Sequence, residues 1–403
     1  MARLVLKFGG TSVADIARIR KVARLVKLQL DLGHEIAVVL SAMAGETNKL
    51  VALAREMQKV PNPREYDLII SAGEQVTVGL LAMALEDIGA SARSFLGWQI
   101  PIRTSDQYGN AWIDQVEGQK LIALMQQKII PVIAGFQGVS PDGSVTTLGR
   151  GGSDTTAVAV AAAVKADQCD IYTDVEGVFT TDPRIVDNAR KLEKISYEEM
   201  QEFASQGAKV LQPQSVEVAR RNKVRVQVLS SFKNEAGTFM VDEKEISNIR
   251  SVSGLAYSKE DTKIEINGAV QDKEIFALLD AANIPVDMVA KNTSLVFTVP
   301  KVDLDRAVKM LRQSQSKLGF SDIMADVNIA KVSIVGLGIR NHPSAAETML
   351  DTLTEKSIAI YATTKCDIKV TVLIGAEHLE SALRALHVAF ALDQDEKTKS
   401  VAA

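Results

Sequence analysis

The sequence predicts an α/β fold, a three-layer αβα sandwich around a mostly parallel central sheet, followed by two smaller α+β units of βαββαβ order. Short apolar runs, such as residues 4–8 and 35–40, alternate with segments of helical periodicity. These runs hold few polar residues, which is typical of parallel strands buried on both faces. The C-terminal part then repeats one pattern of strand and helix, which indicates a duplicated unit.

The composition is that of an ordinary globular protein of two or three domains. The 403 residues are 24% charged and 46% hydrophobic, a balance that can bury a substantial core. The net charge of −4 gives no electrostatic reason to expect nucleic acid or an acidic membrane surface as a partner. We find no signal-peptide pattern and no apolar stretch near the ~18 residues of a membrane span. Cys169 and Cys366 have no metal or redox spacing, so we expect a cytoplasmic protein.

The first predicted strand, over residues 4–8, leads into the glycine-rich run KFGGTS at residues 7–12. Glycines allow the backbone to approach an anion closely. Lys7 stands directly before them, where its ammonium would face a transferring phosphate. A lysine within an apolar strand also often extends its charge to solvent, and this alternative stays open for Lys7.

A second loop of the same kind, GRGGSDTT at residues 149–156, precedes an unbroken helix of small apolar residues. Ser153 and Asp154 are good N-cap residues, so we expect this loop to feed a helix N-terminus, which suits phosphate or carboxylate. Asp154 would orient Lys7 or only cap its helix. Arg150 would bind an anion with two N–H groups or stay in solvent. The alternative for the whole run is a purely structural role, as a tight turn into a buried helix.

Polar residues also follow other predicted strands. The strand at 35–40 runs into Ser41, and the strand at 168–172 runs into Thr173 and Asp174. The carboxyl ends of parallel strands form the binding edge of such a sheet. We therefore expect these side chains to share one site with the glycine-rich loops.

Three further residues have both a functional and a structural interpretation. Thr47 and Glu74 begin or lie in helical patterns, where they would hold the charged groups of an amino acid, although each alone is more simply structural. Arg184 follows Asp182-Pro183, which fits a nucleotide-binding loop but is also a plain turn signal.

The C-terminal repeat sets the predicted domain limits. In both copies a strand precedes a helix with Leu-x-x-Ala-x-x-x-Leu, at residues 304–311 and 379–386. Each copy reads as a βαββαβ unit of about 70 residues. We place the boundaries at 1–244, at 245–330 for the first unit with a lead-in strand, and at 331–403 for the second. The run GLGIRN at 336–341 almost matches a dinucleotide fingerprint but lacks its third glycine, and we interpret it as a turn.

Several familiar sites are excluded. The sequence has no G-x-x-x-x-G-K-[ST] loop, no H-R-D set and no H-E-x-x-H, and its four histidines are isolated, so we expect no zinc centre. What remains is an anion site made of two glycine-rich loops in one α/β domain.

At this point the chain resembles the aspartate kinases of the amino acid kinase family, over nearly its whole length. The resemblance rests on seven runs in matching order: KFGGTS (7–12), VLSAM (39–43), AGE (72–74), TTLGRGGSD (146–154), YTDVEG (172–177), TDPR (181–184) and GAKVL (207–211). The duplicated C-terminal units resemble ACT domains, the regulatory amino acid-binding modules of that family.

The resemblance implies transfer of a phosphoryl group from MgATP to the side-chain carboxylate of L-aspartate, the first step towards lysine, methionine and threonine. It implies Lys7 and Asp154 as catalytic residues. For aspartate it implies Thr47, Glu74, Arg150, Gly151 and Ser153. For ATP it implies Lys7, Gly9, Gly10, Ser41, Thr173, Asp174, Phe179, Arg184 and Lys209. The cofactors would be ATP and Mg²⁺, with the metal mainly on the nucleotide.

For the ACT region the resemblance implies a lysine or threonine effector and a homo-oligomer formed through the ACT domains, in some relatives with a short ACT-only chain. The regulatory residues would be Asn267, Val286, Asp287, Thr364 and Asp367. The sequence departs from the family's pattern at Pro285, at Lys291 and around residues 364–367. Because proline removes a donor and lysine adds a charge, we expect weakened or altered feedback inhibition.

Two other functions compete with this interpretation. Acetylglutamate, glutamate 5- and uridylate kinases share the fold, but the ACT pair and the AGE run at 72–74 match aspartate kinases better. A non-catalytic amino acid sensor would show damaged catalytic positions, whereas Lys7, Glu74 and Asp154 are all present.

Overall fold

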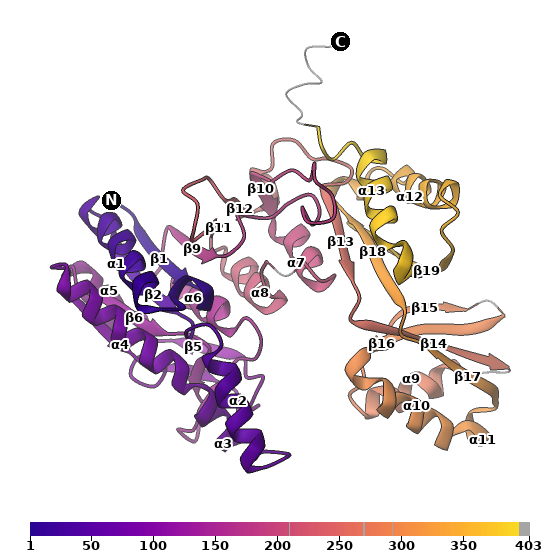
Figure 1. Cartoon of the computed structure of the whole chain (residues 1–403), viewed down its shortest axis with the longest axis horizontal. Helices are drawn as coiled ribbons and strands as arrows, with labels where there is room; N and C mark the ends of the chain where they lie inside the picture. Colours follow the sequence, from indigo (N-terminus) through magenta and orange to yellow (C-terminus); the bar gives the residue numbers. More distant parts are fainter. Residues whose placement is uncertain (209, 269–270, 292, 395–403) are drawn as a thin grey trace, which may run out of the picture. The chain divides into compact units, whose positions relative to one another are not determined.

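The computed structural model describes residues 1–208, 210–268, 271–291 and 293–394 (Figure 1). The chain forms two compact units. The first comprises Met1–Val178, Lys191–Ala204 and Lys209–Ser247, and the second comprises Phe179–Arg190, Ser205–Ala208 and Asn248–Ala403.

The centre of the first unit is an eight-stranded sheet in the order β10-β12-β11-β9-β1-β2-β6-β3. Every pair is parallel except β11 with β12, as the buried apolar runs predicted. The strands are β1 (Arg3–Phe8), β2 (Glu35–Leu40), β3 (Ala92–Phe95), β6 (Ile130–Ala134), β9 (Gln168–Thr173), β10 (Lys194–Ser196), β11 (Val226–Ser230) and β12 (Thr238–Val241). A smaller sheet, β5-β4-β7-β8, contains β4 (Ile102–Thr104), β5 (Ile113–Val116), β7 (Gln137–Val139) and β8 (Val145–Thr147).

Helices cover both faces of the large sheet. On one face α1 (Ile16–Asp31) and α4 (Ala72–Asp87) pack on Leu4, Leu6 and Phe8 of β1. The opposite face receives α6 (Gly152–Ala163), whose alanines permit close packing on the strands. The remaining helices are η1 (Gly10–Val13), α2 (Glu46–Met57), α3 (Pro63–Ile70), α5 (Gln119–Gln126), α7 (Tyr197–Ser205), α8 (Pro213–Asn222) and η2 (Glu243–Glu245). This confirms the three-layer αβα sandwich.

The segment Pro63–Asp87 forms two consecutive helices. The structure ends α3 at Ile70 and begins α4 at Ala72, with Ser71 between them. Taken together the two helices have the length and hydropathy of a membrane-spanning helix, which the sequence analysis did not recognise. Val78, Leu81 and Leu85 of α4 are buried in the core beside β1, as in the core helix of a globular domain.

The second unit contains two antiparallel four-stranded sheets, each covered by helices. The first has the order β15-β16-β14-β17 and the predicted βαββαβ sequence of elements. Its elements are β14 (Asp261–Gly268), α9 (Asp272–Ala281), β15 (Asp287–Lys291), β16 (Ser294–Pro300), η3 (Lys301–Asp303), α10 (Leu304–Gln313), α11 (Gln315–Leu318) and β17 (Phe320–Asp326). Ile264, Phe297 and Leu311 lie in its core.

The second sheet has the order β13-β18-β20-β19. Its elements are β13 (Gly254–Ser258), β18 (Ile329–Val335), η4 (Leu337–Arg340), α12 (Ser344–Glu355), β19 (Ile360–Cys366), β20 (Lys369–Gly375), η5 (Ala376–His378) and α13 (Leu379–Ala389). The sequence analysis assigned β13 to the first unit as a lead-in strand, but β13 pairs with β18. The physical reason is that β14 already has β16 and β17 on its two sides. The GLGIRN run forms η4, a turn, as predicted.

Lys331 of β18 joins the two sheets. Its side chain is only 6% exposed, and its Nζ lies 2.9 Å from Asp261 Oδ1 and 2.7 Å from Asp287 Oδ2. Both carboxylates belong to the first sheet. Met288 and Leu373 are buried in an apolar cluster shared by the two sheets. Apolar packing and a buried cation therefore hold the two sheets in one unit.

We predict that Lys331→Met lowers the free energy of unfolding by about 1–3 kcal/mol, because it removes the cation from the mostly buried Asp261, whereas Asp287 is exposed enough for solvent to screen its charge. The exposed Lys317→Met is the matched control and should change stability by less than about 0.5 kcal/mol. Urea unfolding of the three proteins measures this difference. Equal midpoints for the two variants would contradict the role given to Lys331.

Candidate active site at the strand carboxyl ends

Four neighbouring parallel strands, β9, β1, β2 and β6, end at the same edge of the large sheet. Backbone hydrogen bonds continue past the strand ends into the loops. Gly9 N donates to Tyr172 O (3.1 Å), Ser41 N donates to Phe8 O (3.1 Å) and Gly135 N donates to Leu40 O (2.9 Å). The structure thus brings together the loops that begin at Gly9, Ser41 and Thr173, as the sequence predicted.

Lys7 and Asp154 form a buried ion pair at this edge. Lys7 Nζ lies 2.5 Å from Asp154 Oδ1, and the two side chains are 9% and 11% exposed. The alternative that Lys7 extends to solvent is therefore wrong. A buried ion pair contributes little net stability, because desolvation of both charges offsets their attraction. Net stability therefore does not explain why this pair is buried here.

The glycines of the first loop give space around this pair. A Cβ on Gly9 would lie 3.4 Å from Lys7 Nζ, and one on Gly10 would lie 2.8 Å from Ala42 O. The N–H of Gly9 is already bonded to Tyr172 O, so it is not available to a phosphate. Gly9 thus contributes the absence of a side chain rather than a backbone donor.

The second glycine-rich loop enters α6 two or three residues earlier than the sequence indicated. The N-cap is Gly151, in the left-handed conformation at φ 68°, and the helix begins at Gly152. Ser153 and Asp154 therefore lie in the first turn and are not the capping residues. A Cβ on Gly151 would lie 2.0 Å from Gln212 Cγ, which adds a steric reason for glycine. Because Asp154 does not cap the helix, its carboxylate is available to Lys7.

Glu74 and Ser153 approach the same edge from two helices. Ala42 N donates to Glu74 Oε1 (3.0 Å), whereas Oε2 is buried without a hydrogen-bond partner among the described residues. Burial raises the pKa of Glu74 to about 7. Ser153 packs against the loop after β6, since a Cβ on Gly135 would lie 2.7 Å from Ser153 Cβ. A buried carboxylate oxygen with no partner is a fitting acceptor for a substrate ammonium.

Two other predicted substrate residues are more open. Thr47 lies half-buried in the first turn of α2, after Gly45 in a left-handed conformation. Arg150 is exposed, and within the described part of the chain its side chain has no hydrogen bond or ion pair. Its planar guanidinium group is thus available to a carboxylate or phosphate.

Asp67 is a site residue that the sequence analysis missed. It is fully buried on α3 and accepts hydrogen bonds from Thr147 N (2.7 Å), Thr147 Oγ1 (2.9 Å) and Gly109 N (2.8 Å). Burial raises its pKa despite these bonds. Thr147 ends β8, two residues before Gly149, so Asp67 fixes the start of the second glycine-rich loop. The available signal was an acidic residue three positions before Ile70, on the buried face of the helix.

Only some of the predicted nucleotide-binding residues lie together at this edge of the sheet. Thr173 and Asp174 follow β9, and Thr173 Oγ1 donates to Asp174 Oδ1 (3.1 Å). Phe179 and Arg184 belong to the second unit. Lys209 lies outside the described residues. Among the described residues no group of three or more His, Cys, Asp or Glu side chains is arranged to hold a metal ion.

The predicted regulatory residues are spread over the two four-stranded sheets of the second unit. Asn267 pairs with Ser294 and Asp287 with Thr298, so these two lie four positions apart along β16. Thr364 is in β19, and Asp367 follows that strand. Asp287 is already bound to Lys331.

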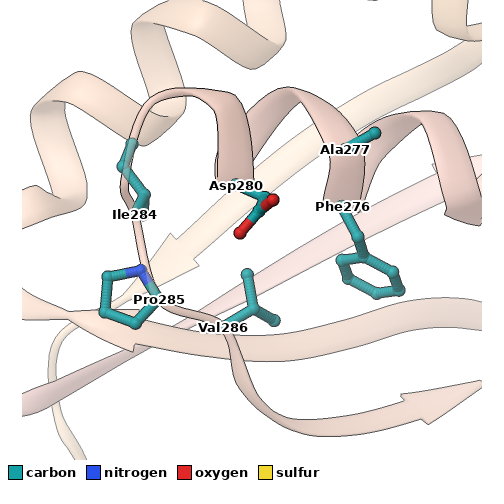
Figure 2. A pocket seen from close by; sticks show the side chains of 6 residues that line it. All are labelled: Phe276, Ala277, Asp280, Ile284, Pro285 and Val286. Atoms are coloured by element: carbon teal, nitrogen blue, oxygen red, sulfur yellow. The ribbon is translucent and has the colours of Figure 1, made fainter.

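Val286 lines a groove of about 410 Å³ between α9 and the chain that leads into β15. Figure 2 shows the Asp280 side chain directed into the space beside Pro285 and Val286. The lining residues are Phe276, Ala277, Asp280, Ile284, Pro285 and Val286. The departure from the family's pattern at Pro285 thus changes the wall of this groove.

Comparison with known proteins agrees with this arrangement. Residues 2–230 match the pattern described as the amino acid kinase family, and residues 332–390 match an ACT domain. The chain belongs to the amino acid kinase family. It is 47% identical over 404 residues to an aspartate kinase of Pseudomonas putida, covering 98% of both chains, and 42% identical over 403 residues to aspartokinase 2 of Bacillus subtilis, covering 98% of this chain and 99% of that protein.

Solved structures of family members extend the comparison. E. coli aspartokinase III in complex with aspartate and ADP is similar with a TM-score of 0.81 at 26% identity, over 96% of this chain and 99% of that chain. The same enzyme in complex with lysine and aspartate has a TM-score of 0.75 over the same shares of the two chains. The chain described in this structure is accordingly a kinase of the aspartate kinase type with a C-terminal ACT regulatory region.

We predict that Glu74→Gln makes the ligand-free protein more stable at pH 8 and leaves it unchanged at pH 4. The folded-state pKa of about 7 exceeds the ordinary value of 4.5, so the folded protein retains a proton between these values that the unfolded chain releases. Stability therefore falls as pH rises through this window. Because Gln does not ionise, the free energy of unfolding of Glu74→Gln at pH 8 should exceed that of the parent protein by about 1–3 kcal/mol.

Urea unfolding at both pH values measures this gain. Glu86→Gln, at an exposed position of the same helix, is the matched control and should change little at either pH. A gain of Glu74→Gln that is equal at pH 4 and pH 8 would refute the raised pKa.

Proposed function

We propose that this protein transfers the γ-phosphoryl group of MgATP to the side-chain carboxylate of L-aspartate, giving 4-phospho-L-aspartate and ADP. The observation that carries the proposal is the buried Lys7–Asp154 pair beside Gly9, at the carboxyl edge of a parallel sheet. The E. coli relative in complex with aspartate and ADP supports the choice of substrates.

The reaction requires positioning and charge neutralisation rather than a general base. An aspartate carboxylate is already an anion at neutral pH, so its oxygen attacks the γ-phosphorus directly. A new carboxylate O–P bond forms while the bond from the γ-phosphorus to the β–γ bridging oxygen breaks, and ADP leaves. The Lys7 ammonium neutralises charge on the transferring group, and Asp154 holds that ammonium in place.

The two substrates would be held by different parts of the edge. The free oxygen of Glu74 would accept the α-ammonium of aspartate, and Arg150 would bind its α-carboxylate, with Thr47, Gly151 and Ser153 around them. ATP would lie along Lys7, Gly9, Gly10, Ser41, Thr173 and Asp174, with Phe179, Arg184 and Lys209 as further contacts. Mg²⁺ would arrive with the nucleotide and keep most of its waters.

The proposal extends to the setting of the enzyme. We assign it to the first step towards lysine, methionine and threonine, in the cytoplasm. We further propose a homo-oligomer formed through the ACT domains, because β17 is an edge strand that an identical edge would pair. A short ACT-only chain is a possible second subunit.

We predict that the purified protein forms aspartyl hydroxamate from ATP, L-aspartate and hydroxylamine, and that Lys7→Met lowers kcat by about 10³-fold or more. Lys49→Met, at an exposed surface pair, is the control and should keep full activity. ADP released only with N-acetylglutamate, glutamate or UMP would replace the substrate in this proposal. Full activity of Lys7→Met would remove its central residue.

We predict that lysine and threonine, alone or together, raise the apparent KM for aspartate by less than about fivefold, the lower end of allosteric coupling. The reason is that Asp287 is bound to Lys331 and Lys291 to Asp272, so an effector must displace internal partners. Initial-rate titrations measure the effect. Strong concerted inhibition by the two amino acids would contradict the expectation.

A further inference from the structure

The strand β11 adds a further carboxyl end to the edge that carries the candidate active site. It runs parallel to β9, and its last residue, Ser230, is the register partner of Thr173. We call residues 230–233 the β11 loop. Its turn is fixed because the N–H groups of Phe232 and Lys233 both donate to Ser230 Oγ (3.2 and 3.3 Å). The β11 loop therefore begins directly beside the end of β9.

Ser231 of the β11 loop bonds to two neighbouring strand ends at once. Its N–H donates to Thr173 O (2.8 Å), at the end of β9. Its Oγ lies 2.5 Å from Ser12 Oγ, so the two hydroxyl groups share a hydrogen bond. Ser12 is buried, and its N–H donates to Gly9 O (2.9 Å), which closes the first glycine-rich loop. Ser231 thus joins this loop to the end of β9.

Arg18 of α1 makes a second, indirect connection between the same loops. Its Nη1 donates to Thr11 O, and its guanidinium carbon lies 5.1 Å from the centroid of the Phe232 ring. Phe232 is 54% exposed, and a cation–π contact is weak where solvent reaches it. The hydroxyl pair of Ser12 and Ser231 is therefore the direct bond between the two loops.

The first glycine-rich loop also carries unused backbone donors. Gly9 N is bonded to Tyr172 O, whereas in the part of the chain that the structure describes the N–H groups of Gly10 and Thr11 have no acceptor. Gly10 is half-buried and Thr11 is exposed, so a ligand at this edge can reach the loop. The direction of these two donors depends on what holds the loop, and Ser12 is the next residue.

We propose that Ser231 is a positioning residue for the nucleotide: its hydroxyl holds Ser12, so that the N–H groups of Gly10 and Thr11 stay directed at the phosphates of ATP. This inference rests on the proposed function, in which ATP lies along the first glycine-rich loop. It adds β11 to the strands that determine nucleotide affinity. Donors that are ordered before the ligand arrives lose less entropy when it binds.

A purely structural role for the Ser231 hydroxyl is the competing interpretation. The bond from Ser231 N to Thr173 O does not involve the side chain, and the two bonds to Ser230 Oγ hold the β11 loop independently. Ser231→Ala should therefore fold and lose only the contact with Ser12. A structural role predicts a lower free energy of unfolding with unchanged nucleotide affinity, whereas a positioning role predicts weaker nucleotide binding.

The test compares Ser231→Ala with Ser294→Ala in the full-length protein. Ser294 is also half-buried, and its hydroxyl donates to Glu265 Oε1 (2.8 Å) in the second unit, so both variants lose one bond between side chains. We expect Ser231→Ala to weaken ADP binding, measured by calorimetry, by about threefold to tenfold and to raise the KM for ATP equally. The KM for aspartate should stay within about twofold. Ser294→Ala should change none of these constants.

A double-mutant cycle shows whether Ser231 acts through Ser12. Ser12→Ala breaks the same bond from the other side and should weaken ADP binding by a similar factor. The double variant should bind ADP no more weakly than either single variant. Should Ser231→Ala not fold, Ser12→Ala alone gives the comparison with Ser294→Ala.

The inference is overturned if Ser231→Ala binds ADP as tightly as Ser294→Ala does, if the effects of Ser12→Ala and Ser231→Ala multiply, or if the parent protein binds no ADP. Failure of the proposed function gives a different result. The parent protein would then bind ADP but turn over no aspartate, and the cycle on ADP affinity would still decide the role of Ser231.

Discussion

The ion pair between Lys7 and Asp154 is the constraint on which the first unit depends. A lysine ammonium can lie within a mostly apolar layer only if a carboxylate meets it and the backbone around it is held firmly. β1 supplies the lysine from the middle of the sheet, where β2 and β9 fix the strand on both sides. α6 supplies the aspartate in its first turn, and its small side chains bring that turn against the strands.

Other buried carboxylates follow the same logic with different partners. Asp67 is satisfied by three protein donors and is inert, a support for the loop that carries Arg150. Glu74 accepts one hydrogen bond, from Ala42 N, and its other carboxylate oxygen has no partner among the described residues, so burial destabilises its charged form. The number of protein donors therefore distinguishes these two buried acids at this edge of the sheet.

Much of this arrangement was predictable from the sequence, for physical reasons. Apolar runs on buried strands and glycines at their ends are local features, so the sheet, the two loops and the place of Lys7 beside the first of them could be inferred. The start of α6 was misplaced because Gly151 takes a left-handed conformation that local cap preferences do not reveal. Asp67 was missed because its three donors are 42 or 80 residues away. The partner of β13 was misassigned because strand pairing depends on which edges remain unoccupied.

The pairing of β13 with β18 gives the second unit an insertion topology. Ser258, the last residue of β13, is the register partner of Lys331, so the whole first βαββαβ module leaves and re-enters the second sheet at adjacent points. Lys331 and the apolar cluster around Met288 tie this module to the sheet that hosts it. A separately translated C-terminal polypeptide would complete the host sheet only if it began before Gly254; Met240 satisfies this condition and Met288 does not.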